Sequence, residues 1–214
     1  MIHRRDDIRR DLLLYLCTDQ GYLGGRSFAG VIEEAIAGGV TMLQIREKDA
    51  CTREFFETAR VARGITKARR IPLVVNDRLD VALAVEADGL HIGQSDLPLR
   101  AARKIAGSKL FIGVSAGTVE DALAAEKDGA DYIGAGAVFP TGSKDDAGSA
   151  IGLEGLARIC AAIRIPVAAI GGISLANAAE VMKAGAAGIA VISAILAQQD
   201  IKAASEALKA HING

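Results

Sequence analysis

The chain has 214 residues, of which 50% are hydrophobic and 4% aromatic, and its formal net charge is −1. A chain of this length fits one domain with a substantial core, and its near-neutral charge argues against the basic surface that nucleic-acid binding needs. No apolar run reaches the roughly 18 residues of a membrane span, and no signal-peptide pattern opens the chain. The three cysteines are an odd number without a CxxC pair, which is typical of a reducing compartment. We therefore predict a cytoplasmic protein with no nucleic-acid or membrane partner.

The chain opens with a charged segment, residues 1–11, in which arginines alternate with aspartates. We interpret this segment as a solvated helical lead-in. From residue 12 onward one unit recurs, in which an Ala-rich helix ends in Gly and a short apolar strand follows. Gly after a helix supplies the left-handed residue that turns the chain back. Eight strands are predicted near residues 12, 42, 73, 89, 111, 132, 167 and 188. Helices are predicted at 27–38, 53–68, 79–87, 99–106, 118–128, 154–163, 175–184 and 200–212.

This succession of strand and helix predicts the fold class. Eight βα units over residues 12–214 indicate a single-domain (β/α)8 TIM barrel, an α/β fold, at the small end of its size range. A doubly wound open sheet is the competing fold. It usually has fewer strands and a Gly-rich first turn, whereas the first turn here, residues 18–21, has no GxGxxG.

In a (β/α)8 barrel the functional residues follow the carboxyl ends of the strands. In this chain those positions are polar, although the strands carry almost no charge. They hold Gln44, Arg46, Glu47, Lys48, Asp49, Asn76, Asp77, His91, Gln94, Asp96, Ser115, Thr141, Gly142, Ser143, Lys144, Gly171, Gly172 and Ser193. Cations, carboxylates and small polar residues in this combination suit phosphorylated ligands and a divalent cation.

Three positions at or after strands 3 and 4 allow more than one interpretation. Asp77 and Asp96 either bind Mg²⁺, which commonly takes one or two carboxylates plus phosphate oxygens, or cap the helices that follow them. His91 is either a general base or a hydrogen-bonded structural histidine, and the structural interpretation is favoured because buried polar groups are usually satisfied.

The later loops point to phosphate. Gly171 and Gly172 either form a tight turn or bind phosphate, and phosphate is favoured because the loops after strands 7 and 8 are the usual phosphate site of this fold. The connection at 138–152 is long for a compact domain, which indicates a functional loop. Its Lys144 is either a solvated charge or part of a clamp over an anionic ligand, and we favour the clamp.

Several motifs in this order resemble one family, thiamine-phosphate synthase, also called thiamine-phosphate pyrophosphorylase. They are YLCTD (15–19), QIREKD (44–49), VVNDR (74–78), HIGQSDLP (91–98), GVSAGT (113–118) and the Thr-Gly-Ser-Lys loop (141–144). The resemblance extends over nearly the whole chain from about residue 12. It implies a transferase that condenses 4-amino-5-hydroxymethyl-2-methylpyrimidine diphosphate with hydroxyethylthiazole phosphate, or its carboxylated form, to give thiamine phosphate and diphosphate.

The resemblance also implies roles for individual residues. Asp77 and Asp96 would hold Mg²⁺, and Lys144, Ser115 and Arg46 would serve catalysis. The pyrimidine diphosphate would be bound by Gln44, Ile45, Arg46, Glu47, Lys48, Asn76, Ser115 and Lys144. The thiazole phosphate would be bound by Thr141, Gly142, Ser143, Gly172, Ile192 and Ser193. The chain departs from the family pattern at Gly117, where His is frequent, and at Ser143, where Thr is usual.

Two other functions stay open at this point. A related thiazole tautomerase would share the fold, and a non-catalytic barrel that binds a phosphorylated ligand would lack one half of the site. The complete set of Asn76, Asp77, Asp96 and Lys144 argues against the tautomerase. The presence of both sides of the site argues against the non-catalytic barrel. The sequence does not decide whether the chain forms a homo-oligomer.

Overall fold

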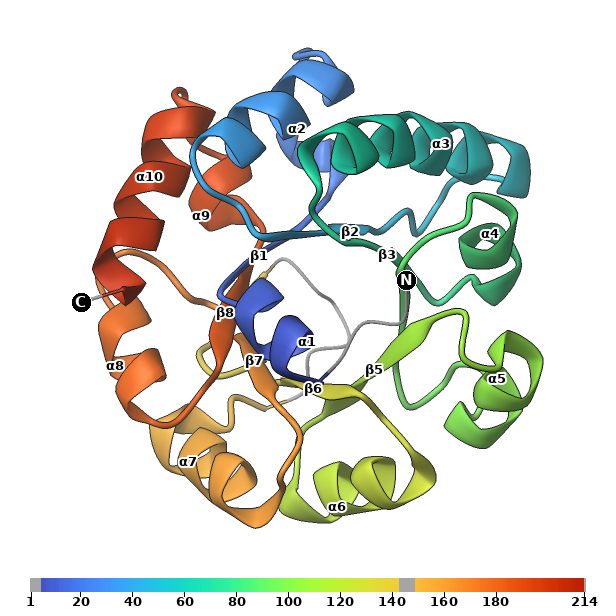
Figure 1. Cartoon of the computed structure of the whole chain (residues 1–214). Coiled ribbons are helices and arrows are strands. Elements are labelled where there is room, and N and C mark those ends of the chain that lie inside the picture. Colours follow the sequence, from blue (N-terminus) through green and yellow to red (C-terminus); the bar gives the residue numbers. More distant parts are fainter. Residues whose placement is uncertain (1–4, 143–148, 214) are drawn as a thin grey trace.

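The computed structural model describes residues 5–142 and 149–213. Within them, eight parallel strands follow one another around a closed barrel, and β8 pairs with β1 to complete it (Figure 1). The strands are β1 Leu14–Cys17, β2 Met42–Ile45, β3 Leu73–Asn76, β4 Gly89–Ile92, β5 Phe111–Ala116, β6 Tyr132–Ala135, β7 Val167–Ile170 and β8 Gly188–Val191. The helices are α1 Arg5–Asp11, α2 Phe28–Ala37, α3 Thr52–Arg69, α4 Leu79–Ala84, α5 Leu99–Ala106, α6 Val119–Asp128, α7 Gly152–Ala162, α8 Ala178–Lys183, α9 Ser193–Leu196 and α10 Ile201–Ile212, with a 3-10 turn η1 at Gln20–Tyr22. The predicted (β/α)8 barrel is confirmed.

The strands are buried on both faces, so the hydrophobic core has two layers. Side chains that point into the barrel form the smaller cluster, which includes Tyr15, Met42, Phe111 and Tyr132. Side chains that point outward form the larger cluster with the surrounding helices. Alanines such as Ala59 and Ala122 are fully buried in this outer layer, where their small size lets the helices lie close to the strands.

Helix α1 closes the amino-terminal end of the barrel. Figure 1 shows it across the centre of the strand ring. Its Ile8 and the following Leu12 are 1% and 0% exposed, and both pack against the inner cluster. The predicted helix is therefore confirmed, but the prediction that it is solvated is wrong, because one apolar face is buried beneath its charged residues.

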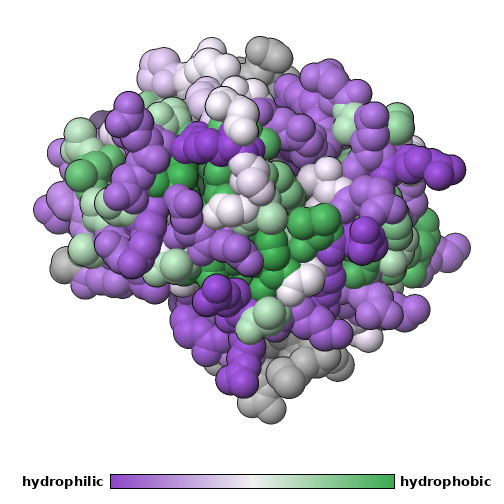
Figure 2. Space-filling view, turned by 90° about the horizontal axis from the view of Figure 1, so that it is seen from above, coloured by the Kyte–Doolittle hydropathy of each residue, from purple (hydrophilic) through white to green (hydrophobic). Residues whose placement is uncertain are grey.

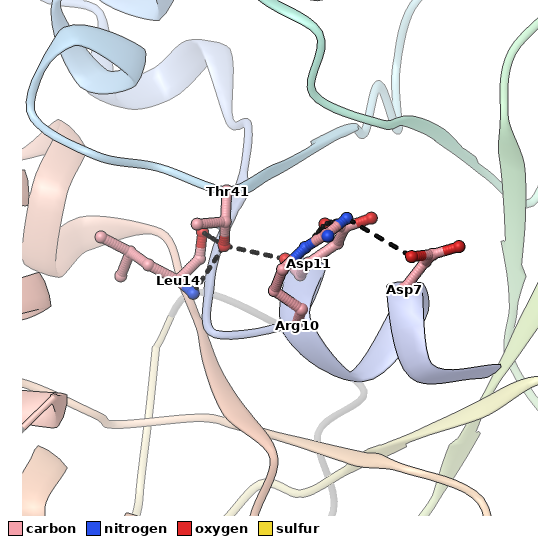
Figure 3. Close-up of polar contacts among 5 residues, drawn as sticks. All are labelled: Asp7, Arg10, Asp11, Leu14 and Thr41. Carbon is pink, nitrogen blue, oxygen red and sulfur yellow. Dashed lines mark hydrogen bonds and ion pairs between the residues drawn. The ribbon is translucent and has the colours of Figure 1, made fainter. Parts of the chain in front are cut away.

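Polar contacts fasten α1 to the barrel. The Thr41 hydroxyl, just before β2, lies 2.8 Å from the carbonyl oxygen of Asp11 and accepts a hydrogen bond of 2.9 Å from the Leu14 backbone N–H (Figure 3). On the helix itself, Arg10 pairs with Asp7 and Asp11. Because the amides of Leu12 and Leu13 bond back to α1, β1 begins at Leu14 and not at the predicted residue 12.

Two aspartates repeat one contact at the same end of the barrel. Asp88 Oδ2 accepts from Arg63 Nη1 (2.7 Å) and from the Leu73 amide that opens β3 (2.9 Å). Asp131 Oδ2 accepts in the same way from Arg103 and from the Ile112 amide of β5 (2.7 Å). Each carboxylate accepts a hydrogen bond from a strand N–H that the hydrogen bonds between the strands leave without a partner, and so contributes to stability.

We expect Asp131→Ala to lower the free energy of unfolding by about 1–3 kcal/mol, because the Ile112 amide and the Arg103 guanidinium both lose their acceptor. Urea denaturation followed by circular dichroism measures the change. Asp128 is a matched control, since its ion pair with Arg100 lies at the surface. Asp128→Ala should leave the midpoint unchanged, and an equal loss in both variants would contradict the structural role of Asp131.

The surface is polar. Figure 2, on the face that carries α2 and α3, shows hydrophilic residues in the majority with smaller hydrophobic areas between them. Across the described residues, no helix combines the length and apolar character that crossing a membrane requires.

Candidate active site

The site lies in a cavity of about 550 Å³ inside the barrel, at the carboxyl ends of the strands. Residues from all eight strands or the loops after them line it. Among the residues predicted from the sequence, the cavity is lined by Gln44, Arg46, Lys48, Asn76, Asp77, Asp96, Ser115, Thr141, Gly172, Ile192 and Ser193. Most of the predicted site is thus brought together in one place.

Alternation along β2 and its extension decides which residues reach the cavity. Successive side chains of an extended segment point to opposite faces, and Gln44, Arg46 and Lys48 all line the cavity. Ile45, between them, is fully buried in the outer cluster. Glu47 points away too: it accepts a hydrogen bond of 2.9 Å from Gln20, and burial raises the pKa of its carboxyl group. Neither Ile45 nor Glu47 is among the lining residues.

Arg46 brings a buried positive charge to the cavity. Its side chain is 9% exposed, and its Nη2 has no hydrogen-bond partner within the described part of the chain. Its Nη1 lies 3.9 Å from Oδ2 of Asp19, at the outer limit of an ion pair. A buried guanidinium nitrogen without an acceptor is costly, so this geometry favours an anionic ligand at Arg46.

The two candidate metal ligands follow neighbouring strands, and neither caps a helix. Asp77 has φ 62°, in the left-handed region, and its amide donates to the His91 carbonyl (2.8 Å). Asp96 Oδ2 accepts from the Gly93 amide (2.7 Å). The residues at the N-caps of α4 and α5 are Arg78 and Pro98, without a side-chain cap bond. The helix-cap interpretation is therefore wrong for both aspartates.

No cluster of three or more His, Cys, Asp or Glu residues suited to a metal occurs in the described ranges. Two carboxylates nevertheless match the way Mg²⁺ binds in proteins, with phosphate oxygens and water completing its coordination. Asp77 and Asp96 line the same cavity as Arg46 and Lys48, so the donor set fits a magnesium-diphosphate complex.

The opposite side of the cavity is built from glycines and small polar residues. Gly171 and Gly172, after β7, have φ values of 101° and 64°, which side chains rarely adopt. The Asn177 side chain holds this turn by donating to the Gly172 carbonyl (3.0 Å) and accepting from the Ser174 amide (2.8 Å). Ser193, the first residue of α9, lines the cavity beside Ile192.

Gly142 is not among the lining residues, and Ser143 and Lys144 fall outside the described residues. Gly117 lines the cavity, and a Cβ there would meet only the Gly136 carbonyl oxygen, at 3.9 Å, so a side chain fits at this position.

Two tyrosines at the site do not stand out in the sequence. Tyr15 lines the cavity, and its hydroxyl accepts a hydrogen bond of 2.6 Å from Gln44. Tyr132 lies behind it, 3.0 Å away between the two hydroxyl oxygens. Both sit in apolar strands, where a tyrosine is read as part of the core. No signal in the sequence marks them, because strands buried on both faces do not show which residues point inward.

A closed (β/α)8 barrel with charged, amide and hydroxyl groups converging on a cavity at the carboxyl ends of its strands defines a barrel enzyme. A family model described as thiamine monophosphate synthase matches residues 14–195. The chain therefore belongs to the thiamine monophosphate synthase family.

Individual relatives agree with this assignment over nearly the full length. The chain is 52% identical to a thiamine-phosphate synthase of Clostridium novyi, covering 91% of this chain and 96% of the relative. It is also 52% identical to a thiamine-phosphate synthase of Chloroflexus aurantiacus, with 95% and 94% covered. Among solved structures, a thiamine phosphate pyrophosphorylase from Pyrococcus furiosus superimposes with a TM-score of 0.89 at 46% identity, covering 96% of this chain and 98% of that chain.

Proposed function

We propose that this chain is a thiamine-phosphate synthase, a transferase that joins 4-amino-5-hydroxymethyl-2-methylpyrimidine diphosphate to hydroxyethylthiazole phosphate, or its carboxylated form. The pyrimidinylmethyl C–O bond breaks, the electron pair leaves with diphosphate, and the thiazole nitrogen forms the new C–N bond. With the carboxylated thiazole, the carboxyl group is also lost as CO₂. The observation that carries the proposal is a single cavity with two unlike sides. One side holds Arg46, Lys48, Asp77 and Asp96, and the other holds Gly172 and Ser193.

The charged side suits the pyrimidine diphosphate. Asp77 and Asp96 would hold Mg²⁺, which supplies positive charge to the departing diphosphate when it is bound. Arg46 and Lys48 would bind diphosphate oxygens, and the buried Nη2 of Arg46 gains an acceptor in this way. The sequence resemblance adds Lys144 to this group.

The chemistry then depends on ionisation and positioning. Gln44, Asn76 and Ser115 line the cavity beside the charged groups and offer hydrogen bonds to the pyrimidine ring. Gly172, Thr141 and Ser193 would hold the thiazole phosphate so that its nitrogen faces the carbon from which diphosphate leaves. No protein nucleophile is needed, and holding both reactants in one cavity removes the entropic cost of their encounter.

A coupled assay for diphosphate release tests the reaction directly. With the pyrimidine diphosphate, the thiazole phosphate and Mg²⁺ all present, diphosphate and thiamine phosphate should form in equal amounts. Omitting either substrate should abolish thiamine phosphate. Formation of a rearranged thiazole phosphate without the pyrimidine substrate would show a tautomerase, and binding without turnover would show a non-catalytic barrel.

Ser193 provides a selective test of the thiazole side. Ser193→Ala should weaken thiazole-phosphate binding roughly 5- to 10-fold, the effect of one lost hydrogen bond, and should leave the affinity for the pyrimidine diphosphate unchanged. Calorimetric titration with each ligand separately measures both affinities. Equal weakening for the two ligands would contradict this division of the cavity.

Gly172 is a less selective target than Ser193. A Cβ at Gly172 would lie 2.7 Å from both Phe139 Cβ and the Pro140 carbonyl oxygen. Any side chain there would therefore disturb the β6–α7 loop in addition to the phosphate site.

A further inference from the structure

Five polar side chains form one continuous chain of hydrogen bonds across the barrel interior. It begins at Gln44, whose Nε2 lies 2.6 Å from the Tyr15 hydroxyl, and passes over 3.0 Å to the hydroxyl of Tyr132. From Tyr132 it continues over 2.9 Å to His91 Nδ1, and from His91 Nε2 over 2.9 Å to Ser115 Oγ. Gln44 and Ser115, at its two ends, line the cavity, whereas Tyr132 does not.

The rings in this chain are held by close packing. Tyr132 lies over Gly113 of β5, where a Cβ would overlap the phenol ring. His91 lies over Gly134 of β6, where a Cβ would come within 2.9 Å of its Cε1. The His91 and Tyr132 rings face each other with centroids 5.5 Å apart. Two strand glycines thus provide the space for these two rings, and the rings have little freedom to turn.

Counting protons gives the chain a direction. Each tyrosine hydroxyl has one proton to donate, and burial raises the pKa of both phenols, so both stay protonated. The Gln44 amide nitrogen can only donate, so the Tyr15 hydroxyl receives its proton and donates its own to Tyr132. Tyr132 in turn donates to His91 Nδ1. A neutral His91 then carries its proton on Nε2 and donates it to the Ser115 oxygen.

We propose that Tyr132 is a positioning residue, which fixes His91 as the Nε2–H tautomer and thereby presents the Ser115 hydroxyl to the cavity as a hydrogen-bond donor. Because the Ser115 oxygen accepts from His91, its own proton is directed to an acceptor in the cavity. A ring nitrogen with a lone pair and no hydrogen fits this donor. The identity of that ligand as an aminopyrimidine rests on the proposed function, whereas the direction of the chain does not.

The tautomer can be measured without any ligand. The protein has three histidines, so labelling them with ¹⁵N and replacing His3 and His211 by Gln leaves His91 as the only signal. Long-range ¹H–¹⁵N correlation at neutral pH distinguishes a protonated Nε2 from a protonated Nδ1. We expect Nε2–H in the otherwise unchanged protein. A protonated Nδ1 would reverse the direction of the hydrogen bonds between Tyr132, His91 and Ser115 and would overturn the proposal.

Two tyrosine variants separate positioning from a structural role. Tyr132→Phe removes the donor to His91 Nδ1. The Nδ1–H tautomer should then appear beside Nε2–H, and His91 should no longer be in a single form. Tyr15→Phe is the matched control: it removes a buried hydroxyl from the same chain but leaves the contact between Tyr132 and His91, so the tautomer should persist. Persistence of Nε2–H as the single form in Tyr132→Phe would contradict the proposal, even if that variant were less stable.

Ligand binding gives the second measurement. Tyr132→Phe should weaken the pyrimidine diphosphate roughly 5- to 10-fold, as should Ser115→Ala, and the double variant should be no weaker than either single one. The affinity for the thiazole phosphate should stay unchanged. Additive losses would show that Tyr132 acts independently of Ser115 and would overturn the proposal. If the unaltered protein failed to bind the pyrimidine diphosphate, the proposed function would fail, and the tautomer result would still decide the direction of the chain.

Discussion

Replacing Asp77 or Asp96 by asparagine is expected to lower turnover about 10³-fold, the scale of losing a metal ion that stabilises several kcal/mol of developing charge. Asparagine suits both positions better than alanine. Asn tolerates the left-handed backbone of Asp77, at φ 62°, and at position 96 it keeps an oxygen for the Gly93 amide. The fold should therefore persist while the charge that binds Mg²⁺ is lost.

Diphosphate release measured over a range of Mg²⁺ concentrations checks this expectation, with far-UV circular dichroism to confirm the fold. Asp80→Asn is the matched control. Asp80 lies close in sequence to Asp77, but it is exposed and paired with Arg78, so its replacement should not change turnover. Full activity of Asp77→Asn or Asp96→Asn in EDTA would exclude a metal at these residues.

Arg46→Met is expected to separate binding from stability. Methionine keeps much of the side-chain length without the charge, so the affinity for the pyrimidine diphosphate should fall roughly 10²-fold, the effect of losing a charge-assisted contact. Without ligand, the free energy of unfolding should not decrease, because the variant removes a buried Nη2 that has no acceptor in the described residues. Calorimetric titration and urea denaturation measure the two quantities.

Arg26 is a control for Arg46, because it is an arginine with a structural role and no place in the cavity. Its guanidinium donates to the carbonyl oxygens of Leu23 (2.9 Å), Gln198 (2.8 Å) and Tyr22 (2.7 Å), so its partners lie within the protein. Arg26→Met should lower stability and leave diphosphate affinity unchanged. If Arg46→Met instead destabilised the free protein as Arg26→Met does, Arg46 would be a structural residue.

The order of the strands and most of the cavity residues could be predicted from the sequence. Gly or Pro residues before most of the strands mark the turns of a repeated unit, and polar side chains stand out where the apolar strands end. What the sequence does not show is the face to which each residue points. Parallel strands buried on both sides lack a hydrophobic alternation, so Ile45 and Glu47 could not be told from their inward-facing neighbours.

The packing of α1 against the end of the barrel could not be predicted for a related reason. Its apolar face reduces to Ile8 and the following Leu12, set among four arginines and three aspartates in residues 1–12. So small a face does not stand out from a charged segment.

The roles of Asp77 and Asp96 were ambiguous because Asp before a helix suits capping and metal binding equally. Only the observed starts of α4 and α5 exclude capping.

The contact between Tyr132 and Gly113 restricts the order in which this barrel can accumulate substitutions. A side chain at position 113 has no room while the tyrosine ring is present, so any route that replaces both must shorten residue 132 first. Descendants that have lost the tyrosine are free to vary at 113, but restoring the tyrosine then requires glycine to return beforehand. The residue allowed at each of the two positions therefore depends on the residue at the other. In an alignment of relatives, residues larger than glycine at position 113 should occur only in chains that lack the aromatic ring at 132.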